Sequence, residues 1–120
     1  MGLAVVFVTG SATVASADEP SAIERGAELF QQYCASCHGR AGYGDGPVGP
    51  SLMVEPADLT RISARNGGEF PMRRVSEQID GRTSVPAHGP REMPVWGYLL
   101  EGEAGDATAS VVEYLRSIQR

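Results

Sequence analysis

Apolar residues recur at helical spacing in three separate stretches of this chain. Within residues 21–32, apolar side chains return every three or four positions, which is the period of one face of an α-helix. Ser21 and Glu24, three residues apart at the start of this stretch, match the capping box that begins many helices. The first predicted helix therefore covers 21–32 and ends just before a cysteine.

The second predicted helix covers residues 71–80, and the third runs from about residue 106 to 118. Pro71 suits the first turn of the second helix and Gly81 suits its end, because helices favour proline early and glycine just past the last turn. Asp106 can cap the third helix. The apolar residues of the third helix share one face, namely Val111, Val112, Leu115 and Ile118.

No stretch of the sequence alternates between apolar and polar residues as a β-strand would. Glycine and proline gather in residues 39–50 and 81–97, which predicts long ordered loops there. The chain is therefore predicted to be all-α, with three main helices and two long loops.

Residues 34–38 read Cys-Ala-Ser-Cys-His, and C-x-x-C-H is the sequence to which a c-type haem is attached. The two thiols add to the two vinyl groups of one porphyrin, and the imidazole of the next residue then reaches the iron. Cys34 and Cys37 are the only cysteines in the chain, so no disulfide is expected. The motif predicts one haem, covalently held by Cys34 and Cys37, with His38 as its first axial ligand.

Two other interpretations of the cysteine pair have weaker support. A thioredoxin-like redox pair needs a βαβ context, and no strand pattern precedes Cys34. A zinc site could use Cys34, Cys37, His38 and the distant His88, but adjacent Cys37 and His38 do not fit the usual spacing of paired zinc ligands. Haem attachment is the chemistry that the motif favours.

The N-terminal residues follow part of the pattern of a secretory signal peptide. Residues 3–8 are apolar, and the small residues after them end in Ala15-Ser16-Ala17, an A-x-A cleavage pattern. The apolar stretch is shorter than the roughly 20 residues of a membrane span, and no Lys or Arg precedes Arg25. We predict a signal peptide at 1–17 and one domain at 18–120 that is exported to the periplasm. A disordered or helical extension is the alternative.

Several residues resemble class I cytochromes c in their order and rough spacing. They are Gly26, Phe30, residues 34–39, Gly49-Pro50-Ser51-Leu52, Met93-Pro94 and Tyr114-Leu115. Four further stretches, 56–60, 66–71, 79–82 and 88–97, are similar to a bacterial subgroup of that class. The resemblance covers essentially all of the predicted domain and implies the all-α cytochrome c fold, wrapped around one covalently bound haem.

The resemblance also implies roles for individual residues. Gly26 lies where the first and last helices cross, and Phe30 packs near Tyr114 and Leu115. The Pro50 carbonyl oxygen accepts a hydrogen bond from His38 Nδ1–H, the kind of outer contact that metal-bound histidines generally need. Leu52 packs on a face of the haem.

Met93 is the expected sixth iron ligand, since its thioether follows the middle helix at the place that the family uses. His88, five residues earlier, is the alternative ligand. Trp96 is expected either to pack on the porphyrin edge or to belong to the core. Candidates for binding the haem propionates, because their side chains suit carboxylates, are Tyr43, Arg65, Arg82 and Arg91.

With His38 and Met93 both on the iron, no coordination position is open to a substrate. Such an iron accepts and passes one electron, and no motif of an enzyme active site is found. The predicted function is electron transfer between respiratory-chain partners, without enzyme activity. A gas-binding or sensing haem protein, or a haem-c peroxidase, is the alternative, and each would need an open sixth position.

The formal net charge is −5, and all ten basic residues are arginine. Net acidity argues against nucleic-acid binding, and the lack of lysine differs from the lysine-ringed docking face of mitochondrial-type cytochromes c. Six arginines and three acidic residues lie in 61–91. This segment could steer an acidic partner, or it could be an ordinary solvated surface. The expected partners are redox proteins in transient contact, and the chain is expected to be a monomer.

Overall fold

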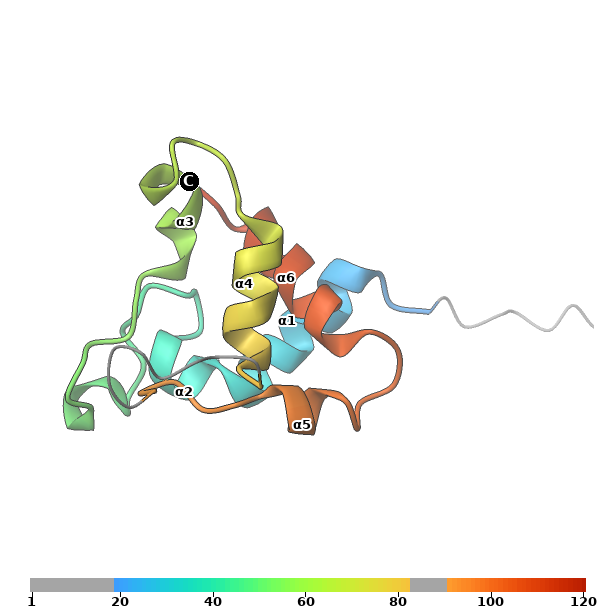
Figure 1. Ribbon diagram of the computed structural model, residues 1–120, viewed down its shortest axis with the longest axis horizontal. Helices are drawn as coiled ribbons and strands as arrows, with labels where there is room; N and C mark the ends of the chain where they lie inside the picture. Colours follow the sequence, from blue (N-terminus) through green and yellow to red (C-terminus); the bar gives the residue numbers. More distant parts are fainter. Residues whose placement is uncertain (1–18, 83–90) are drawn as a thin grey trace, which may run out of the picture.

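Two long helices from opposite ends of the chain cross and form the centre of the fold (Figure 1). They are α1 (Ala22–Tyr33) and α6 (Ala107–Ser117) in a computed structural model that describes residues 19–82 and 91–120. Ser21 Oγ accepts the Glu24 N–H at 3.2 Å and the Glu24 carboxylate accepts the Ser21 N–H at 2.8 Å. The predicted capping box and both terminal helices are therefore confirmed.

The crossing is close because α1 carries a glycine where it meets α6. A Cβ atom built on Gly26 would lie 1.9 Å from the backbone oxygen of Ser110 and 2.9 Å from Tyr114 Cβ. One turn further along α1, the Phe30 ring packs against the Tyr114 ring with centroids 5.2 Å apart. The contact expected of Gly26 and Phe30 is confirmed.

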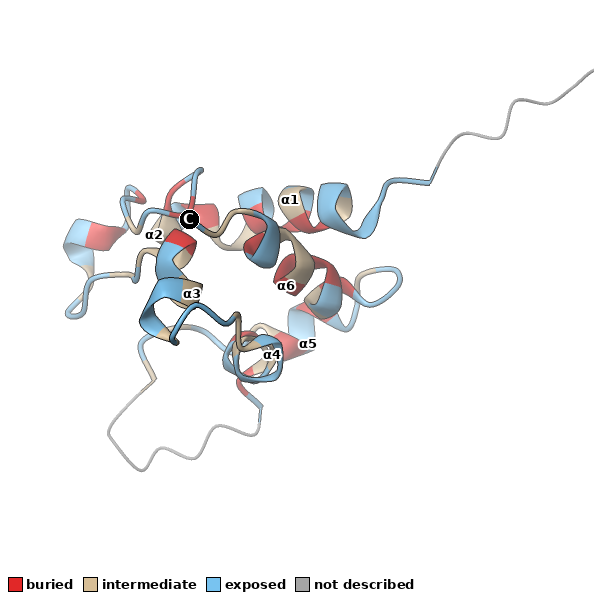
Figure 2. Cartoon of the chain, turned by 90° about the horizontal axis from the view of Figure 1, so that it is seen from above, coloured by how far each residue is buried: buried red, intermediate tan, exposed pale blue. Residues whose placement is uncertain are grey.

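The third main helix, α4 (Met72–Asp80), packs against α6. It begins after Pro71 and ends at Gly81, whose φ of 70° lies in the left-handed region. Glycine adopts this conformation without the steric cost that a Cβ atom brings. The predicted bounds of the middle helix are confirmed, and Figure 2 shows the buried sides of the helices turned towards one another.

Apolar side chains from the three main helices and from two short helical turns form one buried core. Its members are Leu29, Phe30, Ala35, Ile79, Leu100, Ala107, Val111, Val112 and Leu115. The amphipathic pattern of the sequence therefore identifies the faces that meet in the interior.

Five short elements, each of three or four residues, complete the described chain. They are α2 (Ala35–His38), η1 (Gly49–Ser51), η2 (Leu59–Arg61), α3 (Ile62–Arg65) and α5 (Gly97–Leu100). None was predicted, because one turn is too short to show a hydrophobic period. Within 19–82 and 91–120 the structure has no β-strand, as expected.

The C-terminus lies beside α3 (Figure 1). The Arg120 N–H donates to the Thr60 carbonyl oxygen at 3.0 Å, and the Ser63 N–H donates to the Gln119 side-chain oxygen at 2.9 Å. These bonds anchor η2 and α3 to the residues that follow α6. Among the described residues, no helix has the length and apolar character needed to cross a bilayer. The predicted signal peptide, 1–17, lies outside the described residues.

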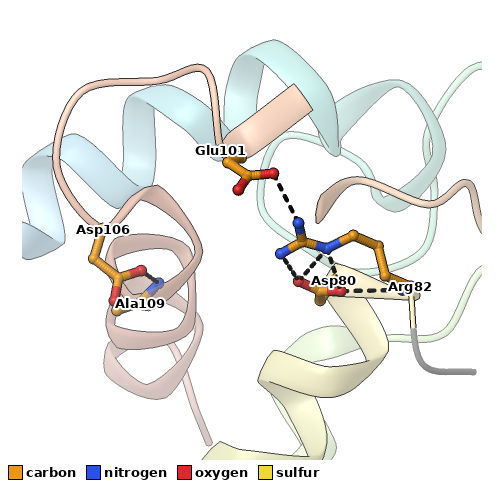
Figure 3. A network of polar contacts seen from close by, with 5 residues as sticks. All are labelled: Asp80, Arg82, Glu101, Asp106 and Ala109. Carbon is orange, nitrogen blue, oxygen red and sulfur yellow. Dashed lines mark hydrogen bonds and ion pairs between the residues drawn. The ribbon is translucent and has the colours of Figure 1, made fainter. Parts of the chain in front are cut away.

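An ion-pair network holds the end of α4 next to α5 (Figure 3). Arg82 donates to the Asp80 carboxylate, with Nη2 at 2.8 Å from Oδ2, and its Nη1 lies 2.8 Å from Glu101 Oε2. At the far side of the same view, Asp106 caps α6 by accepting the Ala109 N–H at 2.9 Å, as predicted. The network joins two segments that are distant in sequence.

The Asp80–Arg82 pair predicts how stability depends on pH. Hydrogen bonds from Arg82 lower the pKa of Asp80 below its ordinary value. The ionised carboxylate therefore stabilises the fold above the unfolded-state pKa of about 3.9, and this contribution is lost as the pH falls further. In urea titrations, Asp80→Asn should be less stable than wild type at neutral pH, and the difference should shrink below about pH 4. Arg82→Gln should reduce this pH dependence without removing it, because the Arg82 backbone N–H still donates to Asp80. A stability difference between Asp80→Asn and wild type that stayed constant into acid would contradict the assignment.

Candidate haem-attachment site

The C-x-x-C-H motif forms a single helical turn at the end of α1. The Cys34 N–H donates to the Phe30 carbonyl oxygen at 2.9 Å, and the His38 N–H donates to the Cys34 carbonyl oxygen at 2.9 Å. Residues three apart on a helical turn share one side, so Cys34 and Cys37 lie on the same side of α2. Both are free thiols of intermediate exposure. The turn thus presents two thiols and one imidazole from five consecutive residues.

Burial favours the neutral forms of Cys34 and His38. It raises the pKa of the Cys34 thiol to about 12, and the neighbouring Cys37 adds to this effect. Burial also lowers the pKa of His38, although its contact with the Ala57 carbonyl acts in the opposite direction. The imidazole is therefore neutral at neutral pH, and neutral imidazole is the form that binds a metal.

The hydrogen-bond partner of His38 is not the one expected. His38 Nδ1 lies 3.0 Å from the carbonyl oxygen of Ala57, rather than that of Pro50. The reason is that the following loop folds back, since Gly44 N–H donates to His38 O at 2.8 Å and Leu59 N–H donates to Gly42 O at 2.7 Å. A carbonyl can only accept, so the proton is on Nδ1 and the lone pair is on Nε2.

The expected second ligand comes from a different part of the chain. Met93 is half-buried and packs against the core. Figure 2 shows α2 on one side of α3 and the segment leading into α5 on the other, as seen in that view. Ligation by Met93 remains a prediction, and the alternative ligand, His88, lies outside the described residues.

Trp96 and Leu52, the two other residues expected near the haem, are both half-buried. Trp96 immediately precedes α5, and its indole packs against the Tyr33 ring with centroids 5.7 Å apart. It is partly buried against the core, which fits the core role that the sequence left open. Leu52 follows η1 and is half-buried. Contacts of either residue, or of Pro50, with haem remain predictions.

The candidates for propionate binding differ in how their donors are used. Arg65 donates to a backbone carbonyl oxygen at 2.9 Å, and Arg82 is paired with two carboxylates. The Arg120 guanidinium lies 4.4 Å from the centre of the exposed Tyr43 ring. Arg91 Nε is buried and has no hydrogen-bond partner among the residues that the structure describes. A buried donor needs an acceptor, and among the four candidates only Arg91 has such a donor in the described part of the chain. Propionate binding by any of the four remains a prediction.

Together these features fit a haem. Two thiols and an imidazole whose Nδ1 is already bound to a carbonyl form the donor set. A porphyrin also needs apolar surroundings. Partly buried apolar side chains packed around the core could supply them, among them Leu59, Phe70, Val75, Met93 and Trp96.

Two contributions to this region were missed in the sequence. One is the Ala57 carbonyl, and since every residue has a backbone carbonyl, no residue pattern could identify it. The other is Tyr33, whose hydroxyl donates to Glu103 Oε1 at 2.5 Å. This hydrogen bond raises the pKa of Tyr33 and ties the residue before the motif to the loop between α5 and α6. The only available signal was an aromatic residue next to Cys34.

Comparison with known proteins places this site in a family. Residues 21–115 match the family model described as cytochrome C oxidase, cbb3-type, subunit III. The chain belongs to this family of c-type cytochromes. Membership confirms the resemblance read from the sequence and the all-α cytochrome c fold, and it implies haem c as the cofactor.

Relatives of this c-type cytochrome occur within larger proteins. It is 34% identical over 84 residues to the cytochrome bc1 complex cytochrome c subunit of Corynebacterium diphtheriae. This alignment covers 68% of this chain and 30% of that subunit. It also aligns with a chain of the Kuenenia stuttgartiensis reducing HAO-like protein complex, with a TM-score of 0.57 and 25% identity. That alignment covers 80% of this chain and 42% of the other. The cytochrome thus spans less than half the length of either relative.

Proposed function

We propose that this c-type cytochrome carries single electrons on one haem c, attached through Cys34 and Cys37 and ligated by His38 and Met93. The observation that carries the proposal is the α2 turn, in which two free thiols lie beside a histidine whose Nδ1 is occupied by the Ala57 carbonyl. Haem supplies, when bound, a one-electron couple between Fe(III) and Fe(II). The protein is proposed to have no enzyme activity.

The residues of the chain have distinct tasks in this proposal. The Ala57 carbonyl fixes the His38 ring and its tautomer, so that Nε2 is directed to the iron. Met93 offers a neutral thioether, which favours the reduced state and raises the potential. With both sides occupied, neither ligand has to move when the electron is transferred, and small molecules are kept from the iron.

The setting of this function is proposed to be an exported respiratory chain. The A-x-A pattern at residues 15–17 supports a signal peptide at 1–17 and a domain at 18–120 in the periplasm. The relatives are part of a cytochrome bc1 complex and of a reducing HAO-like complex, which supports redox proteins as partners. The arginine-rich segment 61–91 is proposed as the docking region for an acidic partner in a transient contact.

Visible spectroscopy of the protein matured in a periplasm tests the proposal. We expect a sharp low-spin spectrum on reduction that carbon monoxide does not change. We also expect haem to stay with the polypeptide on a denaturing gel, and a Cys34→Ala/Cys37→Ala double variant to lose it. A reduced spectrum that shifts with carbon monoxide would instead support the gas-binding or peroxidase alternative. Haem that leaves the wild-type chain on the gel would contradict covalent attachment.

A further inference from the structure

The C-terminal end of α4 is capped by the segment that carries Met93. The last carbonyls of a helix have no partner within the helix and must find one elsewhere. Arg91 Nη2 donates to the Gln78 carbonyl oxygen, and the Trp96 N–H donates to the Ile79 carbonyl oxygen at 3.3 Å. Arg91 precedes Met93 and Trp96 follows it, so the chain on each side of Met93 binds one of two consecutive carbonyls in the last turn of α4.

Arg91 also binds the Met93 segment itself. The same Nη2 atom lies 3.3 Å from the carbonyl oxygen of Pro94, the residue directly after Met93. The guanidinium thus links the end of α4 to the peptide next to the expected iron ligand. A positive charge is also favourable at a helix C-terminus, where the helix dipole is negative.

The backbone of α4 leaves room for this guanidinium. A Cβ atom on Gly81 would lie 2.8 Å from Arg91 Cζ and 3.0 Å from its Nε. Gly81 therefore serves two purposes, since its left-handed conformation ends the helix and its missing side chain admits the arginine. The close fit indicates that Arg91 is held in place rather than extended into solvent.

We propose that Arg91 is a positioning residue for the sixth iron ligand, acting through Pro94 to hold Met93 in place. This inference rests on the proposed His38 and Met93 ligation. Without the bridge between Gln78 and Pro94, the segment keeps its bond at Trp96 and its core contacts but loses the hydrogen bond next to Met93. Loss of Arg91 is expected to loosen the methionine more than it loosens the fold.

The chain provides a matched control at the same end of α4. Arg82 is also next to this helix terminus, but its partners are the carboxylates of Asp80 and Glu101 (Figure 3). Arg82→Gln removes an arginine and its ion pairs and leaves the bonds to Gln78 and Pro94 intact. If arginines near α4 act only through overall stability, Arg82→Gln and Arg91→Gln should affect Met93 equally.

The experiment uses the matured haem protein and two readouts in urea. Helical circular dichroism follows global unfolding, and the sulfur-to-iron charge-transfer band of the oxidised protein follows methionine ligation. In wild type we compare the urea concentration at which the band is lost with the concentration at which the helices unfold. In Arg91→Gln the band should be lost further below the unfolding midpoint than it is in wild type. The reduced protein should also bind carbon monoxide about tenfold more readily, since a hydrogen bond from a charged group is lost. Arg91→Lys should restore this only in part, because an ammonium group lacks the planar fork of donors.

The possible outcomes separate this inference from the function on which it rests. One outcome is that loss of the band and global unfolding shift by the same amount in each variant, with equal carbon monoxide binding in Arg82→Gln and Arg91→Gln. That result would mean that the positioning role of Arg91 is wrong while His/Met ligation stands. If the wild-type protein already binds carbon monoxide fully, the ligation proposal fails and takes the role of Arg91 towards iron with it. A selective effect of Arg91→Gln supports both.

Discussion

Replacing Gly26 by valine is expected to cost about 3 kcal/mol or more of folding free energy, because it overpacks the close crossing of α1 and α6. The first atom of any side chain there would lie 1.9 Å from the Ser110 carbonyl oxygen and 2.6 Å from its carbon. Both are backbone atoms of α6, so no rotamer change can relieve the clash and the two helices must separate. Since small domains have total stabilities of about 5–15 kcal/mol, this substitution should remove a large share of the folding free energy and lower the urea midpoint clearly.

Urea denaturation followed by circular dichroism measures this effect, and Gly102→Ala is the matched control. At Gly102 an added Cβ would approach nothing closer than 3.4 Å, so that variant should stay within about 0.5 kcal/mol of wild type. A Gly26→Val protein with the wild-type urea midpoint would contradict the close crossing of α1 and α6. Separation of these helices would also disturb α2, which directly follows α1, so haem incorporation should fall together with stability.

Replacing Met93 by alanine is expected to open the sixth coordination position of the iron. The thioether is the ligand that favours the reduced state, so the reduction potential should fall. The oxidised spectrum should become high-spin, and the reduced protein should bind carbon monoxide. Redox titration and carbon monoxide difference spectra on the matured protein measure these changes.

The best control for Met93→Ala is Met53→Ala. Met53 is 93% exposed, so its removal tests the loss of a methionine that touches little of the protein. We expect its potential and spectrum to equal those of wild type. An unchanged potential in Met93→Ala would exclude Met93 as the ligand and direct attention to His88. Equal changes in both variants would point to a general effect of methionine loss.

The haem-attachment motif and the main helices could be read from the sequence because their signals are local. Cys34, Cys37 and His38 carry their meaning in five consecutive residues, and a capping box or a terminal glycine acts within one helical turn. The same holds for the apolar faces of α1, α4 and α6, whose period reflects the geometry of a single helix. These features needed no knowledge of what lies beside them.

Contacts between distant segments were decided only by the tertiary structure. The Ala57 carbonyl replaced that of Pro50 next to His38 because a loop folds back on the motif, and backbone carbonyls leave no mark in a sequence. The links from Tyr33 to Glu103 and from Arg91 to Pro94 likewise depend on how the chain packs. The sequence by itself thus determined which chemistry and which helices this protein has. The tertiary structure decided which groups orient that chemistry, since orientation depends on neighbours brought together by folding.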